Sequence, residues 1–246
     1  MKNLDKLRKK IDLIDDKILE LLKNRSKIAL DIGNLKSKNS KNSNLFRPER
    51  QMKILSRLFL NKNSLFSEQD ILSFWKEIFF HQTNLQGGIE FLISETLKKS
   101  EKKIIFDAFG YNIVIKTYKS LDKAFLKIKK NKNKLLILPY PDKVKRDHWW
   151  INKNFKDLFI ISVIPFLKKK NSTPKLVVVS KDKPILEGNN SFIYLSQISI
   201  KDKSLKKIHQ LKSNYLYASA NLLNYNELKF LGAYPDFKLK KNNEKN

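Results

Sequence analysis

The chain has 246 residues, a formal net charge of +27 and no cysteine, which excludes disulfides, thiolate catalysis and cysteine-based zinc sites. A hydrophobic fraction of 41% with 16 Phe indicates a folded protein. Three widely separated histidines offer no metal-ligand spacing, so we expect no metal. No apolar run is long enough to span a membrane and the N-terminal region has no signal-peptide pattern, so we expect a cytoplasmic protein without membrane contact.

The charge makes nucleic-acid binding a function to consider, because basic proteins attract phosphate backbones. Lysine is spread through nearly every segment and no nucleic-acid-binding motif accompanies it, which favours a solvated lysine-rich surface. Arginine is distributed differently, since five of the six arginines lie in the first 57 residues. A guanidinium grips carboxylates with two parallel hydrogen bonds, so an arginine in a lysine-rich chain indicates a position that needs this group.

Apolar residues recur at alternating steps of four and three from Leu4 to about Lys36, which predicts one long helix. At 1.5 Å per residue it would be about 50 Å long, more than a small domain can cover. Its apolar stripe therefore predicts a partner chain, and a homodimer is the natural inference.

One core position of this stripe is occupied by Arg25. Burying an unpaired guanidinium costs several kcal/mol, so an anion should meet it. Lys36 returns to nearly the same helix face, and the intervening Ala29 and Gly33 are small, which predicts a cavity for a compact dianion. The alternative is a coiled-coil core in which the arginine pairs with a carboxylate of the partner helix. Three acidic residues fit that alternative: Asp12, Asp15 and Asp16.

Two shorter helices are predicted next. Residues 37–44 are polar and aperiodic and predict a loop, after which Pro48 suits the first position of a second helix. A third helix begins with the capping pair Ser67 and Asp70 and ends at a pair of glycines.

The buried face of the third helix carries Gln82, with Gln86 one turn further. Two buried amides together with a buried arginine favour a shared polar pocket. We therefore predict that residues 1–87 form an all-α domain of three helices.

After the glycine pair, short β-branched and aromatic runs replace the helical pattern. They predict an α/β domain over residues 103–237, preceded by a connecting segment 88–102 and followed by a polar tail 238–246. Strands are predicted over residues 104–106, 112–118, 135–138, 158–164, 176–179, 192–200 and 228–231. Helices are predicted over residues 121–130 and 205–211.

The segments LDKLRKKIDLIDDKILELLKNRSKIALDIGNLK, RPERQ and FWKEIFFHQTNLQ resemble the all-helical (type II) chorismate mutases, including the mutase part of bifunctional chorismate mutase/prephenate dehydratase enzymes. The resemblance keeps the order and spacing of all three helices. It implies an intertwined homodimer and an isomerase that converts chorismate to prephenate in phenylalanine and tyrosine biosynthesis. This intramolecular Claisen rearrangement needs no cofactor, because the protein has only to hold a flexible dianion in its reactive chair.

The resemblance also implies roles for individual residues. Arg25 and Lys36 would bind the substrate carboxylates within one subunit, and Arg8 would reach in from the partner subunit. Lys36 and Gln86 would donate to the ether oxygen, on which negative charge grows as the C–O bond breaks. Arg50 would line the same pocket.

Two positions depart from a common form of the family pattern. Gln51 stands where many members have a glutamate that accepts from the ring hydroxyl of the substrate, and its carbonyl can still accept. Gln82 stands where a small hydroxyl residue is frequent, and we expect it to be a tolerated polar contact in the substrate site. Neither change removes a cation.

Beyond the helices, FLGAYPDF is similar to the ending of the amino-acid-sensing ACT region of prephenate dehydratases. The Thr-Arg-Phe signature of the dehydratase is absent, since the comparable strand reads PKLVVVSKD, so we expect no dehydratase activity. The second domain would then serve regulation, dimer support or partner contact. Two other functions fit the helical part: an isochorismate pyruvate lyase, which RPERQ and Gln86 disfavour, and a catalytically silent sensor or partner-binding protein.

Overall fold

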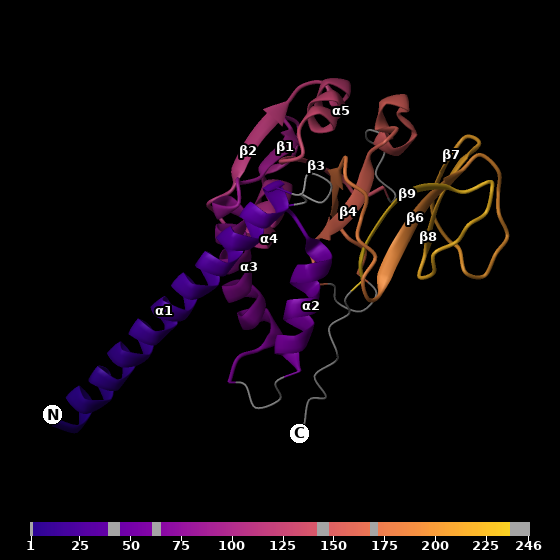
Figure 1. Ribbon diagram of the computed structural model, residues 1–246. Helices are drawn as coiled ribbons and strands as arrows, with labels where there is room; N and C mark the ends of the chain where they lie inside the picture. The colour runs from indigo at the N-terminus through magenta and orange to yellow at the C-terminus, as the bar shows by residue number, and fades with distance from the viewer. Residues whose placement is uncertain (1, 39–44, 61–64, 142–147, 168–171, 237–246) are drawn as a thin grey trace.

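The computed structural model describes residues 2–38, 45–60, 65–141, 148–167 and 172–236 (Figure 1). The side chains of residue 2 and residues 36–38 lie outside this description, as do the predicted tail 238–246 and residues 39–44 of the predicted loop. Three helices come first, and a mixed sheet with two covering helices follows. An all-α region followed by an α/β region is therefore confirmed.

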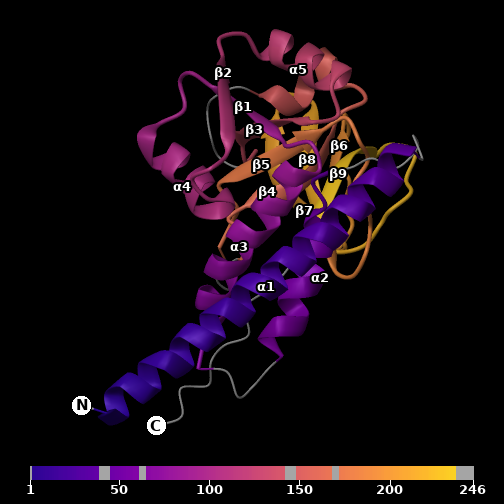
Figure 2. The same cartoon turned by 60° about the vertical axis from the view of Figure 1, so that its left-hand side comes forward.

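The three helices are α1 (Lys2–Lys38), α2 (Pro48–Phe59) and α3 (Glu68–Leu85). Pro48 begins α2 as predicted, and a capping box of Ser67 and Asp70 begins α3, with the Ser67 side chain accepting from the Asp70 N–H. The N-terminal end of α1 extends away from the rest of the molecule (Figures 1 and 2). No helix in the described ranges is long and apolar enough to cross a membrane.

The apolar stripe of α1 is exposed in the single chain. Nine of its side chains keep 45–68% of their surface exposed. They are Leu4, Leu7, Ile11, Ile14, Ile18, Leu21, Ile28, Ile32 and Leu35. A soluble helix does not ordinarily present such a stripe to water, so this face has the character of an interface.

The sheet has nine strands among the described residues, in the order β2-β1-β3-β5-β4-β9-β6-β8-β7. The strands are β1 (Glu90–Ser94), β2 (Val114–Tyr118), β3 (Lys134–Pro139), β4 (Phe159–Ile164), β5 (Leu176–Ser180), β6 (Asn190–Ser196), β7 (Lys206–Leu211), β8 (Asn214–Ser219) and β9 (Lys229–Pro235). Strands β1, β2 and β3 are parallel, and α4 (Lys99–Phe109) and α5 (Leu121–Lys130) connect them. Two short 3-10 turns, Trp149–Ile151 and Lys153–Phe155, precede β4.

Several elements differ from the sequence prediction. The segment expected to be a connection contains β1 and the start of α4, and the strand expected over residues 104–106 lies inside α4. The helix expected over 205–211 is instead the edge strand β7, joined to β8 by a turn in which Lys212 has a φ of 52°. A short apolar run such as residues 104–106 cannot be assigned to a buried helix or to a strand by periodicity alone, which explains the error at α4.

The two regions pack against each other, so α2 and α3 are fixed to the sheet. Phe80 of α3 and Phe46, just before α2, belong to the same buried cluster as Phe91 of β1 and Phe109 of α4. Met52 and Leu55 of α2 pack with Leu167, which follows β4. The other face of the sheet is covered by α5 and the 3-10 turns.

Gly232 connects the two halves of the sheet. It pairs with Ile160 of β4, which lies in the β2-β1-β3-β5-β4 part of the sheet, and its φ is 142°. A Cβ at this position would lie 2.2 Å from the Ile160 carbonyl oxygen, so the close approach of β4 and β9 requires glycine. Residues 230–235 of the FLGAYPDF motif therefore belong to the strand that joins the β2-β1-β3-β5-β4 part of the sheet to the β6-β8-β7 part.

Candidate active site

A cavity of about 310 Å³ lies where the C-terminal part of α1 meets α2 and α3. Five of the predicted site residues line it: Arg25, Arg50, Gln51, Gln82 and Gln86. Arg47, Ala29 and several apolar side chains complete the lining, and no described acidic residue takes part in it. Three guanidiniums around a cavity without carboxylates create a site for an anion.

Arg25 carries the clearest sign of a missing partner. Its Nη1 is buried and has no hydrogen-bond partner among the described residues, and none of their carboxylates forms an ion pair with it. Its guanidinium carbon lies 5.7 Å from the centre of the Phe79 ring, which supplies a weak cation–π contact. Burial, and then the nearby charge of Arg50, lower the pKa of Arg25. An anion in the cavity would offset both the lost hydration of Arg25 and its repulsion from Arg50.

The C-terminal end of α3 positions the side-chain amides of Gln82 and Gln86. Gln82 is buried, and the neighbouring Thr83 donates its hydroxyl to the Phe79 carbonyl, 2.9 Å away. Gln86 is the C-cap residue, and its backbone N–H reaches the carbonyl of Gln82 at 3.3 Å. The predicted buried position of Gln82 is therefore confirmed.

Gln86 also touches α1. A Cβ built on Gly33 would lie 3.0 Å from Cγ of Gln86 and 3.7 Å from its Cα. The glycine thus lets the backbone of α1 approach the end of α3, which brings Gln86 to the rim shared with Arg25.

Arg47 is a cavity residue to which the sequence analysis gave no role. It is the N-cap residue of α2, and its Nε donates to Oε1 of the buried Glu49 at 2.6 Å. Its Nη2 lies 3.8 Å from Oε1 of Glu187, in the segment between β5 and β6. The concentration of arginine near the N-terminus marks Arg47 as unusual, but no local pattern indicates its contact with Glu187.

Arg8 does not line the cavity of the single chain, and the position of the Lys36 side chain stays a prediction. Arg8 is exposed and forms an ion pair only within its own helix among the described contacts, 3.6 Å from Asp5. It precedes Arg25 by 17 residues on one helix, which is about 25 Å along the axis. The side chain of Lys36 lies outside the described residues, although its backbone continues α1 beyond Gly33.

Three helices around an arginine-lined cavity form a positively charged pocket of a size that suits a small organic anion. Residues 7–87, which contain all of these helical site residues, match the family model described as chorismate mutase type II. The chain is also similar to the bifunctional chorismate mutase/prephenate dehydratase of Aquifex aeolicus, with 36% identity over 94 residues. That match covers 37% of this chain and 25% of the relative, so the chain spans about a quarter of the relative's length.

Two solved structures are similar over a larger part of the chain at low identity. A protein described as a novel type of quorum-quenching acylase has a TM-score of 0.42 and 10% identity, and the match covers 60% of this chain and 95% of that protein. Prephenate dehydratase from Streptococcus mutans has a TM-score of 0.39 and 9% identity, over 61% of this chain and 100% of the dehydratase.

Proposed function

We propose that this protein is a chorismate mutase that converts chorismate to prephenate for aromatic amino-acid biosynthesis in the cytoplasm. The observation that carries the proposal is the buried, unpartnered Nη1 of Arg25 in a cavity lined by three arginines and no described carboxylate. Chorismate is a small dianion, and a site of this charge binds it without metal or cofactor. The type II match over residues 7–87 supports the same assignment.

In the proposed reaction the residues hold the substrate and stabilise charge. Arg25 and Arg50 bind carboxylates, which places negative charge beside two guanidiniums that repel each other. Gln86 and Lys36 donate to the ether oxygen as its bond stretches. Gln51 and Gln82 supply polar contacts at the remaining sides of the ring. The gain comes from fixing the reactive chair and from donors already aimed at the developing negative charge.

We also propose that two chains pair through the exposed stripe of α1, with Arg8 completing the cavity of the partner. Support comes from that stripe and from the roughly 25 Å between Arg8 and Arg25 on one helix, which prevents Arg8 from reaching its own cavity. The lysine-rich α/β part requires no nucleic-acid partner in this proposal.

Mixing two inactive variants tests the pairing. Arg8→Ala and Arg25→Ala should each abolish turnover, but a heterodimer of the two contains one site with both changes and one intact site. Random exchange makes half of the dimers mixed, so about a quarter of the wild-type activity should return. If mixing restores nothing although sedimentation shows exchanged dimers, Arg8 does not act in the partner's cavity.

The activity itself is tested by following chorismate loss by absorbance, with isochorismate as a parallel substrate to detect lyase activity. Arg25→Ala should lower kcat/KM at least about 100-fold, because it removes a charge-assisted contact to the substrate. Arg57→Ala is the matched control, since Arg57 is exposed on α2 and does not line the cavity. A wild-type chain that leaves chorismate unchanged, or equal losses in the two variants, would overturn the proposal.

A further inference from the structure

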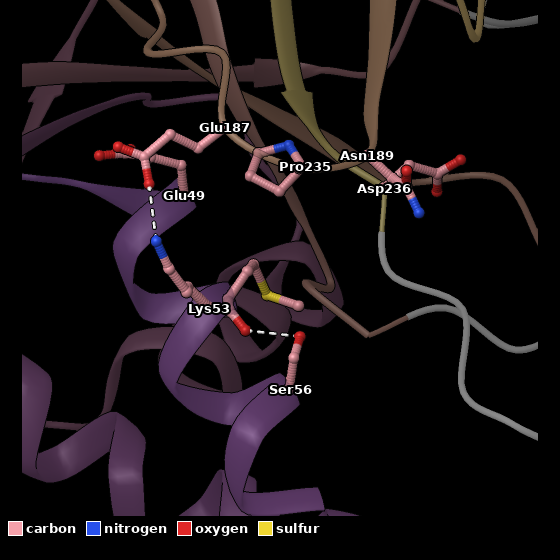
Figure 3. Close-up of a pocket in the computed structure, with 9 residues that line it drawn as sticks. Glu49, Lys53, Ser56, Glu187, Asn189, Pro235 and Asp236 are labelled. Atoms are coloured by element: carbon pink, nitrogen blue, oxygen red, sulfur yellow. Dashed lines mark hydrogen bonds and ion pairs between the residues drawn. The ribbon is translucent and has the colours of Figure 1, made fainter. Parts of the chain in front are cut away.

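The α/β region contributes one charged group to the surroundings of the cavity. Glu187 lies between β5 and β6, and its two oxygens form separate ion pairs with helix α2. Oε1 lies 3.8 Å from Nη2 of Arg47, and Oε2 lies 3.7 Å from Nζ of Lys53. Figure 3 shows Glu187 beside Glu49, facing Lys53 on α2.

These contacts determine where the Arg47 guanidinium can lie. Its Nε is held by the buried carboxylate of Glu49 and its Nη2 by Glu187, so two different nitrogens of one planar group have fixed partners. The guanidinium has further N–H groups for the cavity that Arg47 lines. Two points of attachment restrict a planar group much more than one does.

The charges of the cluster balance. Arg47 and Lys53 carry two positive charges, and Glu49 and Glu187 carry two negative charges. A third guanidinium can therefore lie near Arg25 and Arg50 without adding the full repulsion of an uncompensated cation.

Ion pairs add to the apolar packing at this end of α2, where Phe46 belongs to a buried cluster with residues of the sheet region. A pocket of about 520 Å³ separates α2 from the segment that contains Glu187 and from the end of β9 (Figure 3). Further along the helix, Met52 and Leu55 pack with Leu167. Glu187 therefore adds a polar attachment, through Arg47, to the apolar contacts that hold α2.

We propose that Glu187 is a positioning residue for the mutase cavity. It holds the Arg47 guanidinium in place, and through this contact the α/β region contributes to substrate binding. This inference rests on the proposed function, because Arg47 matters only if the cavity binds the substrate.

The experiment uses the full chain and measures kcat and KM for chorismate. Glu187→Ala should raise KM about two- to fivefold with a smaller change in kcat, the range expected for a partly exposed ion pair. Glu187→Lys should raise KM further, because it places a cation against Arg47. Glu95→Gln is the matched control, since Glu95 is an exposed carboxylate that follows β1 and lines neither pocket. Thermal unfolding of each variant reports whether the fold is intact.

A double-mutant cycle separates positioning from general stability. If Glu187 acts through Arg47, then Glu187→Ala should have no further effect on KM in an Arg47→Met background. An unchanged KM in Glu187→Ala, or an equal rise in both backgrounds, overturns the inference while leaving the mutase assignment intact. Absence of chorismate conversion by the wild-type chain overturns both.

Discussion

Replacing Gly33 with alanine is expected to damage the chemistry while leaving the fold stable. The new Cβ would lie 3.0 Å from Cγ of Gln86 and 3.5 Å from its Cβ. Ordinary carbon contacts are about 3.5–4.0 Å, so the Gln86 side chain has to move. Alanine is favoured over glycine in a helix by about 0.5–1 kcal/mol, and forcing Gln86 off its rotamer costs about 0.5–1.5 kcal/mol. These two free energies nearly cancel in the stability of the protein.

Catalytic activity, unlike stability, gains nothing from the higher helix propensity of alanine. Removing a donor to a developing oxyanion costs about 10²–10³ in kcat, and a displaced donor loses part of that. We therefore expect Gly33→Ala to lower kcat about tenfold, with little change in KM or in the unfolding temperature. The assay is chorismate loss by absorbance, with thermal unfolding as the stability measurement.

Gln86→Ala supplies the control for this prediction. If Gly33→Ala acts by moving the glutamine, it should have no additional effect on kcat in the Gln86→Ala background. A Gly33→Ala protein with wild-type kcat would refute the reasoning, and so would an equal loss in both backgrounds. Either result would mean that Gln86 is not the donor that the helix contact positions.

Three further outcomes are expected from the packing and charge of the molecule. Arg25→Met should abolish turnover but raise the free energy of unfolding of the ligand-free protein by about 1 kcal/mol in chemical unfolding. The reason is that it removes a buried nitrogen without a described partner. A loss of stability would show that Arg25 is paired. Burial raises the pKa of the Glu90 carboxyl, but hydrogen bonds from Lys116 and Lys134 outweigh it and leave the pKa below its usual value. A carboxyl with a lowered pKa stabilises the fold above the pKa of the unfolded chain, and this contribution is lost as the pH falls through the folded value. Glu90→Gln should therefore be less stable than wild type in urea at pH 7, with the difference shrinking in acid; a difference independent of pH would contradict this. A fragment of residues 1–90 should show no cooperative thermal transition by circular dichroism, because it loses the sheet side of its packing, and a sharp transition would show an independent helical domain.

The helical elements could be predicted because their patterns are long and their ends are marked by specific residues. The heptad-like stripe of α1 continues for many turns, Pro48 begins α2, and the Ser67 capping box begins α3. Arg25 stood out for the same reason, since one cation interrupts an otherwise regular stripe. The structure brings five of the predicted site residues to one cavity, while the positions of Arg8 and Lys36 stay predictions.

The strands of the sheet were harder to predict from the sequence, because each strand is short and contacts residues that are distant in sequence. The five residues of β1 and the apolar run inside α4 give no periodicity that separates strand from helix. Strand β8 was missed, and its partner β7 was predicted as a helix, because pairing across a tight turn depends on the partner strand more than on local propensity. The contact of Glu187 with Arg47 joins residues far apart in sequence and has no local signature.

Helix α2 takes part both in the lining of the cavity and in the packing between the two regions of the chain. One side of α2 presents Arg50 and Gln51 to the cavity, and another side presents Met52 and Leu55 to a buried cluster that includes residues of α3 and Leu167. A helix of 12 residues is a stiff rod of about 18 Å, so neither side can shift without the other. Arg25 and Arg50 repel each other and so supply no cohesion between the helices that carry them. The apolar packing of α2 and α3 against the sheet opposes this repulsion, and the α/β region thereby supports the shape of the cavity.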